Sequence, residues 1–370
     1  MQCVCQENGE VILLNNIIRK QFAEINLRDS FFQSLRNDYQ GFDEWFQKKS
    51  NQGAYAFVQY ENSRVIGFLY LKVEERIVND VVPNILADRI LKIGTFKIEA
   101  HGTKMGEQFI KVIMDYAISE NVDVCYLTIY EKHHSLIDLV CRFGFEAYGE
   151  KGEGLHKENV YLKQMKKITG DIYKDFPYVN VDATKKYLLS IYPKYHSVMF
   201  PDSILTTENK DIITDVSYTN SIHKIYVCTM EQVEELKYGD IVVLYRTAEE
   251  GRSAEYSAVA TSVCVVEDVK KQDEFASFED FYKYASKYSV FDKRDLRYWY
   301  NRGGCKAIKM TYNAAFTRRI VRHDLIEEVG LDRDRYWGFF ELTDRQFQKI
   351  TQRGGIGRIL SDRTNVRRNS

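Results

Sequence analysis

The chain has 370 residues, of which 44% are hydrophobic and 14% aromatic, and only four prolines, which excludes a disordered or fibrous protein and predicts two domains. Its 52 basic and 53 acidic residues nearly cancel, so no overall field would hold it on nucleic acid, and any such contact must be local. No stretch approaches the roughly 20 apolar residues that span a bilayer, and the N-terminus lacks a signal peptide's layout, so we expect a cytoplasmic protein without a membrane partner.

The seven cysteines are scattered and odd in number, which indicates reduced packing residues rather than disulfides. Cys3 and Cys5 form half of a metal-binding pattern, but no second Cys or His pair with zinc spacing answers them. We therefore expect no metal. The sequence leaves the oligomeric state open.

The first third of the chain alternates between helix and strand patterns. Seven apolar side chains recur at spacings of three and four and predict a helical region with an aromatic stripe: Phe31, Phe32, Leu35, Tyr39, Phe42, Trp45 and Phe46. The runs 54–60 and 64–73 are rich in β-branched and aromatic residues around a polar turn. This pattern is typical of a β-hairpin.

A strand predicted over 93–98 runs through one short loop into a helix whose apolar positions share one side: Met105, Phe109, Val112, Ile113, Tyr116 and Ala117. A strand over 122–130, a helix over 134–142 that stops at Gly144, and a closing strand over 159–165 follow. Residues 1–167 therefore predict an α/β domain, a mixed sheet with flanking helices.

The loop after the strand at 93–98 has the pattern of a phosphate-binding site. A strand that feeds a glycine-containing loop and then a helix aims unpaired N–H groups and the positive end of the helix dipole at one spot. That spot suits a pyrophosphate. The candidate residues for this spot are those of the loop and the helix start, His101, Gly102, Thr103, Lys104, Met105 and Gly106.

This loop resembles the coenzyme A loop of the GNAT acetyltransferases, which reads Arg/Gln-x-x-Gly-x-Gly/Ala between that family's fourth strand and third helix. His101-Gly-Thr-Lys104-Met-Gly106 stands in that place, with His101 where Arg or Gln is usual and Lys104 replacing the middle glycine. Gly144-Phe145 is similar to the end of the family's closing motif. The resemblance covers residues 10–166 and implies acetyl-coenzyme A as the co-substrate. The alternative is another α/β domain that uses the loop only for packing.

A GNAT-like site implies that an amine attacks the thioester directly while a strand N–H stabilises the carbonyl oxygen. The resemblance implies that Phe96, Lys97 and Ile98 supply that strand edge, which makes them further candidate cofactor-binding residues. Glu99, at the end of the strand, is a candidate base for the amine proton. Alternatively, Glu99 is a solvated loop carboxylate without a catalytic role.

The family's usual general acid is a Tyr on the helix before Gly-Phe, and Val140 occupies that position here. Tyr130, His133 and His134 lie near the same end of the neighbouring strand and are candidate replacements. A lone histidine is also common as a surface or capping residue.

Between 168 and 220 the periodicity is lost and three of the prolines occur, which predicts an extended connector. From 222 onward strand patterns dominate, at 222–228, 240–246, 256–269, 305–312 and 336–342. Helix-start boxes at Ser277 and Thr343 predict attached helices. We therefore expect a β-rich barrel over 221–352 and a basic, mobile tail over 353–370.

Gly239-Asp240 followed by the strand at 241–246 resembles the opening of PUA-like barrels, a group that includes the ASCH domains. The resemblance implies RNA or a modified base as a partner. Arginines interleaved with aromatic rings suit phosphate pairing and base stacking, and the candidate nucleic-acid residues are Arg246, Arg294, Arg297, Trp299 and Arg302. The same pattern is also typical of an amphipathic helix with buried aromatics and solvated arginines.

Together these patterns predict an acetyl-coenzyme A-dependent N-acetyltransferase whose acceptor is RNA, another nucleic acid or a nucleotide-like amine held by the C-terminal domain. One alternative keeps the acetyltransferase and makes the acceptor a protein or a small amine. Another treats the altered loop and the missing acid as signs of a degenerate GNAT fold that binds without catalysis.

Overall fold

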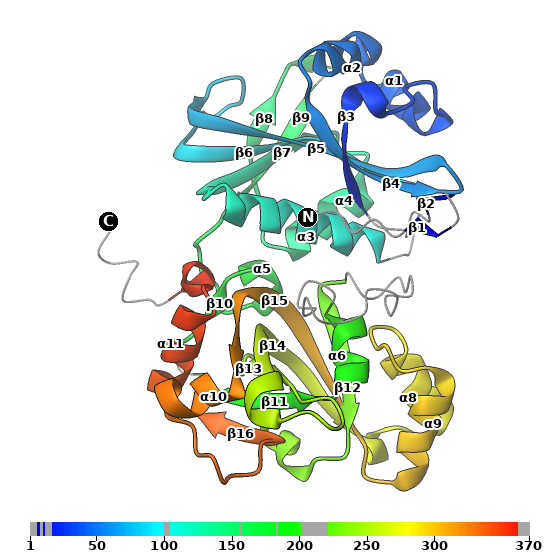
Figure 1. Cartoon of the computed structure of the whole chain (residues 1–370). Helices are drawn as coiled ribbons and strands as arrows, with labels where there is room; N and C mark the ends of the chain where they lie inside the picture. Colours follow the sequence, from blue (N-terminus) through cyan, green and yellow to red (C-terminus); the bar gives the residue numbers. More distant parts are fainter. Residues whose placement is uncertain are drawn as a thin grey trace. The chain divides into compact units, whose positions relative to one another are not determined.

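The structure is a computed structural model that describes residues 17–99, 104–154, 157–182, 184–200 and 221–361, together with the backbone of 6–7 and 10–11. Cys3, Cys5, His101, Gly102 and Thr103 lie outside the described residues, as do 201–220 and the tail beyond 361. The chain divides into two compact units, 1–165 and 166–370 (Figure 1).

The first unit is built on a seven-stranded sheet in the order β3-β4-β5-β6-β7-β9-β8. Its strands are β3 (Ile18–Gln21), β4 (Tyr55–Glu61), β5 (Arg64–Val78), β6 (Ile85–Ile98), β7 (Val124–Ile129), β8 (Glu146–Lys151) and β9 (Glu158–Gln164). Only β6 and β7 are parallel neighbours among these strands, and α3 (Met105–Ser119) supplies the crossover that a parallel pair requires. A separate two-stranded sheet pairs β1 (Gln6–Glu7) with β2 (Glu10–Val11).

Helices cover both faces of the seven-stranded sheet. On β5, Gly67 faces α3, where it meets Phe109, and the next residue, Phe68, faces the opposite side because side chains alternate along a strand. α4 (His134–Arg142) packs beside α3. The opposite face carries the N-terminal helices, which are η1 (Phe22–Glu24), η2 (Ser30–Phe32), α1 (Gln33–Asp38) and α2 (Phe42–Asn51). The predicted aromatic stripe packs there with Phe68, so that prediction is confirmed.

Gly67 allows α3 to approach the sheet. A Cβ at this position would lie 2.5 Å from Cε2 of the fully buried Phe109 ring. We expect Gly67→Ala to lower the free energy of unfolding by about 1–3 kcal/mol, the usual cost of overpacking a core. Urea denaturation measures the loss, and adding Phe109→Leu should recover part of it. Unchanged stability in the single variant would show that the ring can move aside.

The second unit is built on a six-stranded sheet in the order β12-β15-β14-β13-β11-β16. Its strands are β11 (Lys186–Ile191), β12 (His223–Cys228), β13 (Ile241–Arg246), β14 (Val259–Lys271), β15 (Lys306–Val321) and β16 (Phe339–Leu342). β11 and β13 run parallel, whereas the other neighbours are antiparallel. β12 and β16 are the edges, so strand pairing does not close this sheet within the described residues. β10 (Val179–Asn180) pairs separately with β17 (Leu360–Ser361).

Short helices surround this sheet, and α6, α8 and α9 share one hydrophobic core with its strands. They are α5 (Ile172–Asp175), α6 (Pro193–Met199), η6 (Glu231–Glu235), α7 (Ala254–Ser257), η7 (Gln272–Glu274), α8 (Phe278–Ala285), α9 (Lys293–Arg302), α10 (Arg322–Asp324), η8 (Leu325–Val329), α11 (Asp344–Arg353) and η9 (Gly357–Ile359). Ser277 and Thr343 cap α8 and α11 as predicted.

The fold class is α/β with two mixed sheets and flanking helices. The first unit was predicted as a mixed sheet with flanking helices. The second was predicted as a β-rich barrel with attached helices, and within the described residues it is an open six-stranded mixed sheet with helices around it. The segment 168–220, predicted as an extended connector, differs in its described part. β11 lies between β13 and β16 with all six residues buried, so part of this segment is integral to the second sheet. No helix in the described part of the chain is long and apolar enough to cross a membrane.

Candidate active site

The end of β6 presents an open backbone edge. β6 pairs with β7 only over residues 90–93, but with β5 as far as Ile98. The β5–β6 register shifts between Tyr70 and Leu71, which leaves Gly94 as a bulge. Beyond Ile93 the two parallel strands therefore separate, and no other described strand pairs with the freed edge.

Two N–H groups of β6 face this gap. The N–H of Glu99 donates to the carbonyl of Ile66 on β5 at 2.9 Å. Because successive residues of a strand direct their N–H groups to opposite sides, those of Ile98 and Phe96 face away from β5, whereas that of Lys97 faces it. Two parallel donors beside a gap are an arrangement that suits a developing oxyanion.

Two charged side chains, those of Lys97 and Glu99, lie at the end of β6 on the sheet face opposite α3. Lys97 Nζ contacts the carbonyl oxygen of Phe31, lies 4.2 Å from the centroid of that ring, and is 3.4 Å from Glu99 Oε1. Burial lowers the pKa of Lys97. Glu99 Oε2 accepts from Arg64 Nη2 at 2.7 Å. Glu99 is therefore a half-buried, paired carboxylate rather than a freely solvated one.

The predicted pyrophosphate loop is described only at its end, where Lys104 precedes the first turn of α3. The roles of His101, Gly102 and Thr103 stay predictions. A Cβ at Gly106 would lie 2.8 Å from Cδ2 of Leu139 on α4. The close approach of α3 and α4 is enough to explain why glycine occupies position 106, even if no ligand binds there. A substitution at Gly106 would therefore affect helix packing as well as any ligand binding.

A second polar group lies where β7 ends, and only some of its residues were predicted from the sequence. We call it the Glu158 cluster, and it comprises Asp38, Tyr39, Thr128, Tyr130, His133 and Glu158. Glu158 of β9 accepts from the Tyr39 hydroxyl and from Thr128 Oγ1, each at 3.0 Å. The rings of Tyr39 and Tyr130 lie 5.3 Å apart. Burial raises the pKa of both tyrosines, so both hydroxyls stay protonated.

Asp38 completes the cluster from the end of α1. Its Oδ2 lies 3.2 Å from His133 Nε2, and its Oδ1 accepts from Lys132 Nζ. Two of the three predicted acid candidates, Tyr130 and His133, therefore lie together. His134 is exposed in the first turn of α4 and makes no contact described here with the cluster.

In the second unit, Arg246 does not lie on an exposed basic patch. Its side chain is only 4% exposed, and Nη2 pairs with Glu249 at 2.9 Å. All six residues of β13 are buried because the strand lies between β11 and β14. The prediction of an exposed arginine at this position is corrected accordingly.

Of the four predicted residues on α9, the three arginines are exposed and the tryptophan is half-buried. Arg294 is 95% exposed, and Arg302 is exposed with Nη1 2.9 Å from the hydroxyl of the exposed Tyr298. Arg297 is 50% exposed and pairs with Glu279 at 3.1 Å, while its guanidinium carbon lies 3.9 Å from the centroid of the Phe278 ring on α8. Trp299 is half-buried against the hydrophobic core. The three arginines of α9 are thus exposed, and the exposed ring beside them is Tyr298 rather than Trp299.

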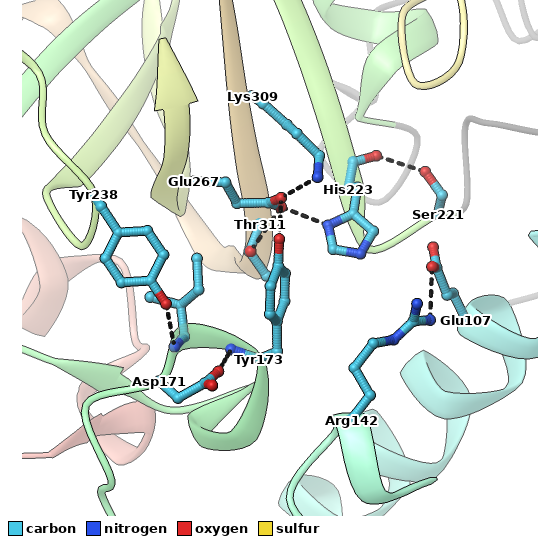
Figure 2. A network of polar contacts seen from close by, with 11 residues as sticks. Glu107, Arg142, Asp171, Tyr173, Ser221, His223, Tyr238, Glu267, Lys309 and Thr311 are labelled. Carbon is cyan, nitrogen blue, oxygen red and sulfur yellow. Dashed lines mark hydrogen bonds and ion pairs between the residues drawn. The ribbon is translucent and has the colours of Figure 1, made fainter. Parts of the chain in front are cut away.

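Figure 2 shows a buried polar network of the second unit around Glu267 on β14. Its carboxylate accepts from four donors: His223 Nδ1 at 2.5 Å, Lys309 Nζ at 2.6 Å, Tyr173 OH at 2.7 Å and Thr311 Oγ1 at 3.0 Å. Burial alone would raise the pKa of Glu267, but His223 and Lys309 hold it at about 2. The network joins α5, β12, β14 and β15.

No protein-family model and no curated protein matches the chain. Among solved structures, the ASCH protein of Zymomonas mobilis is 9% identical, with 45% of this chain and 94% of that chain covered and a TM-score of 0.32. A GNAT-family acetyltransferase of Streptococcus agalactiae is 13% identical, with 37% and 79% covered and a TM-score of 0.28. An Arabidopsis thaliana protein in complex with the bisubstrate analogue CoA-Ac-MVNAL is 16% identical, with 38% and 96% covered and a TM-score of 0.27. Both families that the sequence motifs resemble are represented, each over less than half of the chain.

Proposed function

We propose that the first unit is an acetyl-coenzyme A-dependent N-acetyltransferase. The observation that carries this proposal is the separation of β6 from β7 beyond Ile93, which turns the N–H groups of Phe96 and Ile98 toward a gap. Donors fixed in this way stabilise the negative charge that develops on a thioester oxygen. α3 begins directly after the following loop, where a helix N-terminus favours phosphate.

In the proposed reaction a neutral amine attacks the thioester carbonyl carbon. Glu99 is the proposed base, and Tyr130 or His133 is the proposed acid for the departing sulfur. The loop residues His101, Gly102, Thr103, Lys104 and Met105, with Gly106, are proposed to hold the pyrophosphate. Lys104 would add a cation where the family's loop has glycine.

Calorimetric titration with acetyl-coenzyme A and coenzyme A tests the proposal, because a ligand that binds the folded state also raises the melting temperature. Binding together with acetyl transfer to an amine would support an enzyme. Binding without transfer to any amine would favour the degenerate binding module. Absence of binding would overturn the proposal.

We also propose α9 of the second unit as the nucleic-acid contact, since it exposes Arg294, Tyr298 and Arg302 together. The sequence suggests either RNA or a nucleotide-like amine held by this unit, or a protein or small amine, as the acceptor, and RNA binding at α9 would not by itself decide between them. We expect Arg294→Glu with Arg302→Glu to weaken binding of an RNA oligonucleotide by about tenfold or more, because phosphate contacts dominate such affinity. Fluorescence anisotropy across salt concentrations measures the change. Lys237→Glu with Arg345→Glu makes the same charge change elsewhere and should have less effect.

A further inference from the structure

Glu158, at the start of β9, is a buried carboxylate. It is 9% exposed and accepts from two neutral hydroxyls, those of Tyr39 and Thr128. It forms no ion pair within the described residues. Carboxylates removed from water are normally paired with a positive group. Since a carboxylate offers about four lone-pair sites, the two hydroxyls leave room for a charged donor.

The surroundings of Glu158 favour a particular kind of cation. The Tyr39 and Tyr130 rings lie beside it, and Lys132 Nζ already sits 5.5 Å from the centroid of Tyr130. Aromatic faces attract ammonium groups. Lys132 is matched by Asp38, so among the residues that the structure describes no cation balances the negative charge of Glu158, and a bound ligand would do so.

The Glu158 cluster borders the gap beside β6. Thr128 and Glu158 belong to β7 and β9, the strands on the far side of that gap. Lys97, at the end of β6, contacts Phe31, and Tyr39 further along the same segment contacts Glu158. η2 and α1 therefore connect the end of β6 to β9 on the face opposite α3.

We infer that the Glu158 cluster binds the acetyl acceptor and selects an alkylammonium, the chemistry shared by lysine side chains and polyamines. The inference rests on the proposed function of the first unit. A nucleobase amine is uncharged at neutral pH and would not balance Glu158. The face opposite α3 is thus the acceptor side of the gap.

The transfer balances as follows. The bound ammonium loses one proton to Glu99 or to water, and its nitrogen then bonds to the thioester carbonyl carbon. The carbon–sulfur bond breaks with its electron pair on sulfur. The nitrogen gives up a second proton, and the thiolate takes up one, so the products are an amide, coenzyme A thiol and one released proton.

Glu158→Gln tests the inference, because it keeps the size of the side chain and removes the charge. The amide oxygen can accept from one of the two hydroxyls, and the amide NH2 can donate to the oxygen of the other. Acceptors are spermidine, a lysine-containing peptide and an RNA oligonucleotide, each with acetyl-coenzyme A. We expect transfer to one or both alkylammonium acceptors, and a rise of about tenfold or more in their KM in the variant, since an ion pair is removed from a buried position. Glu150→Gln changes an exposed carboxylate of β8 that pairs with Lys157, and its KM should match the wild type.

An unchanged KM in Glu158→Gln would overturn the inference, and so would transfer to RNA with none to spermidine or peptide. Glu158→Asp separates charge from folding: an ammonium site predicts a KM below that of the Gln variant, whereas a purely structural role predicts no such recovery. Calorimetric titration of spermidine measures the site without the reaction. Failure of acetyl-coenzyme A to bind would instead count against the proposed function, while spermidine binding lost only in Glu158→Gln would still support the site.

Discussion

Glu99→Gln is expected to lower the rate of acetyl transfer about a hundredfold or more with little change in acetyl-coenzyme A affinity, because it removes the proposed base. Glu99 follows the open edge of β6, and Arg64 holds one of its oxygens at 2.7 Å. Glutamine keeps the size of the side chain and an acceptor for Arg64, but it does not take up a proton. Single-turnover kinetics with calorimetry on the same variant separate the chemical step from binding.

Two further variants decide whether the effect belongs to proton transfer. If Glu99 acts only as the partner of Arg64, then Arg64→Gln should reproduce the loss. Glu75→Gln replaces an exposed carboxylate elsewhere on β5 and should leave the rate unchanged. An undiminished rate in Glu99→Gln would leave this residue as an ion-pair partner.

Amphipathic periodicity predicted most of the elements because it reports which side of a helix or strand is buried. It correctly predicted α3 and the hairpin of β4 and β5. It gave β6 as 93–98, whereas the strand begins at Ile85, since charged residues such as Asp88 and Arg89 interrupt its first half. β11 was missed because its short apolar run lies among prolines, so local turn signals outweighed a strand that is fixed by its two neighbours.

The candidate site was predictable where it is continuous in sequence. Residues 96–106 form one strand–loop–helix unit, and the order of its three parts follows from the local sequence pattern alone. The Glu158 cluster instead draws on three distant segments, at 38–39, 128–133 and 158. Periodicity places Tyr130 and His133 near the end of β7, but it does not say that Asp38 and Tyr39 meet them there. The one local signal was a carboxylate at the start of a strand.

Burial also determines which of the predicted nucleic-acid residues are exposed. Arg246 ends a strand, and strand ends are commonly exposed, but β13 is central and its last residue is covered. Trp299 lies on the side of α9 that packs on the core, whereas Arg297 stays half exposed beside the Phe278 ring, as expected for an amphipathic helix. The two readings of this helix that the sequence left open therefore apply to different residues of it.

The Glu267 network joins four elements of the second unit, so its loss is expected to be costly. We expect Glu267→Leu to lower the free energy of unfolding by about 3 kcal/mol, because breaking a buried pair leaves Lys309 without its anion. The double variant with Lys309→Met should recover part of that loss, since neither charge then remains. Glu279→Gln changes an exposed carboxylate and serves as the control. Chemical denaturation measures all three.

The pH dependence of the unfolding free energy tests the Glu267 network independently. The pKa of Glu267 is held at about 2 in the folded chain, below the value of about 4.3 usual for an unfolded glutamate. A lowered folded-state pKa contributes stability that is fully present above the unfolded value and is lost as pH falls toward 2. The difference in unfolding free energy between wild type and Glu267→Leu should therefore shrink between about pH 4.3 and pH 2. A difference that stays constant over that interval would show that Glu267 stabilises the second unit by packing rather than by its charge.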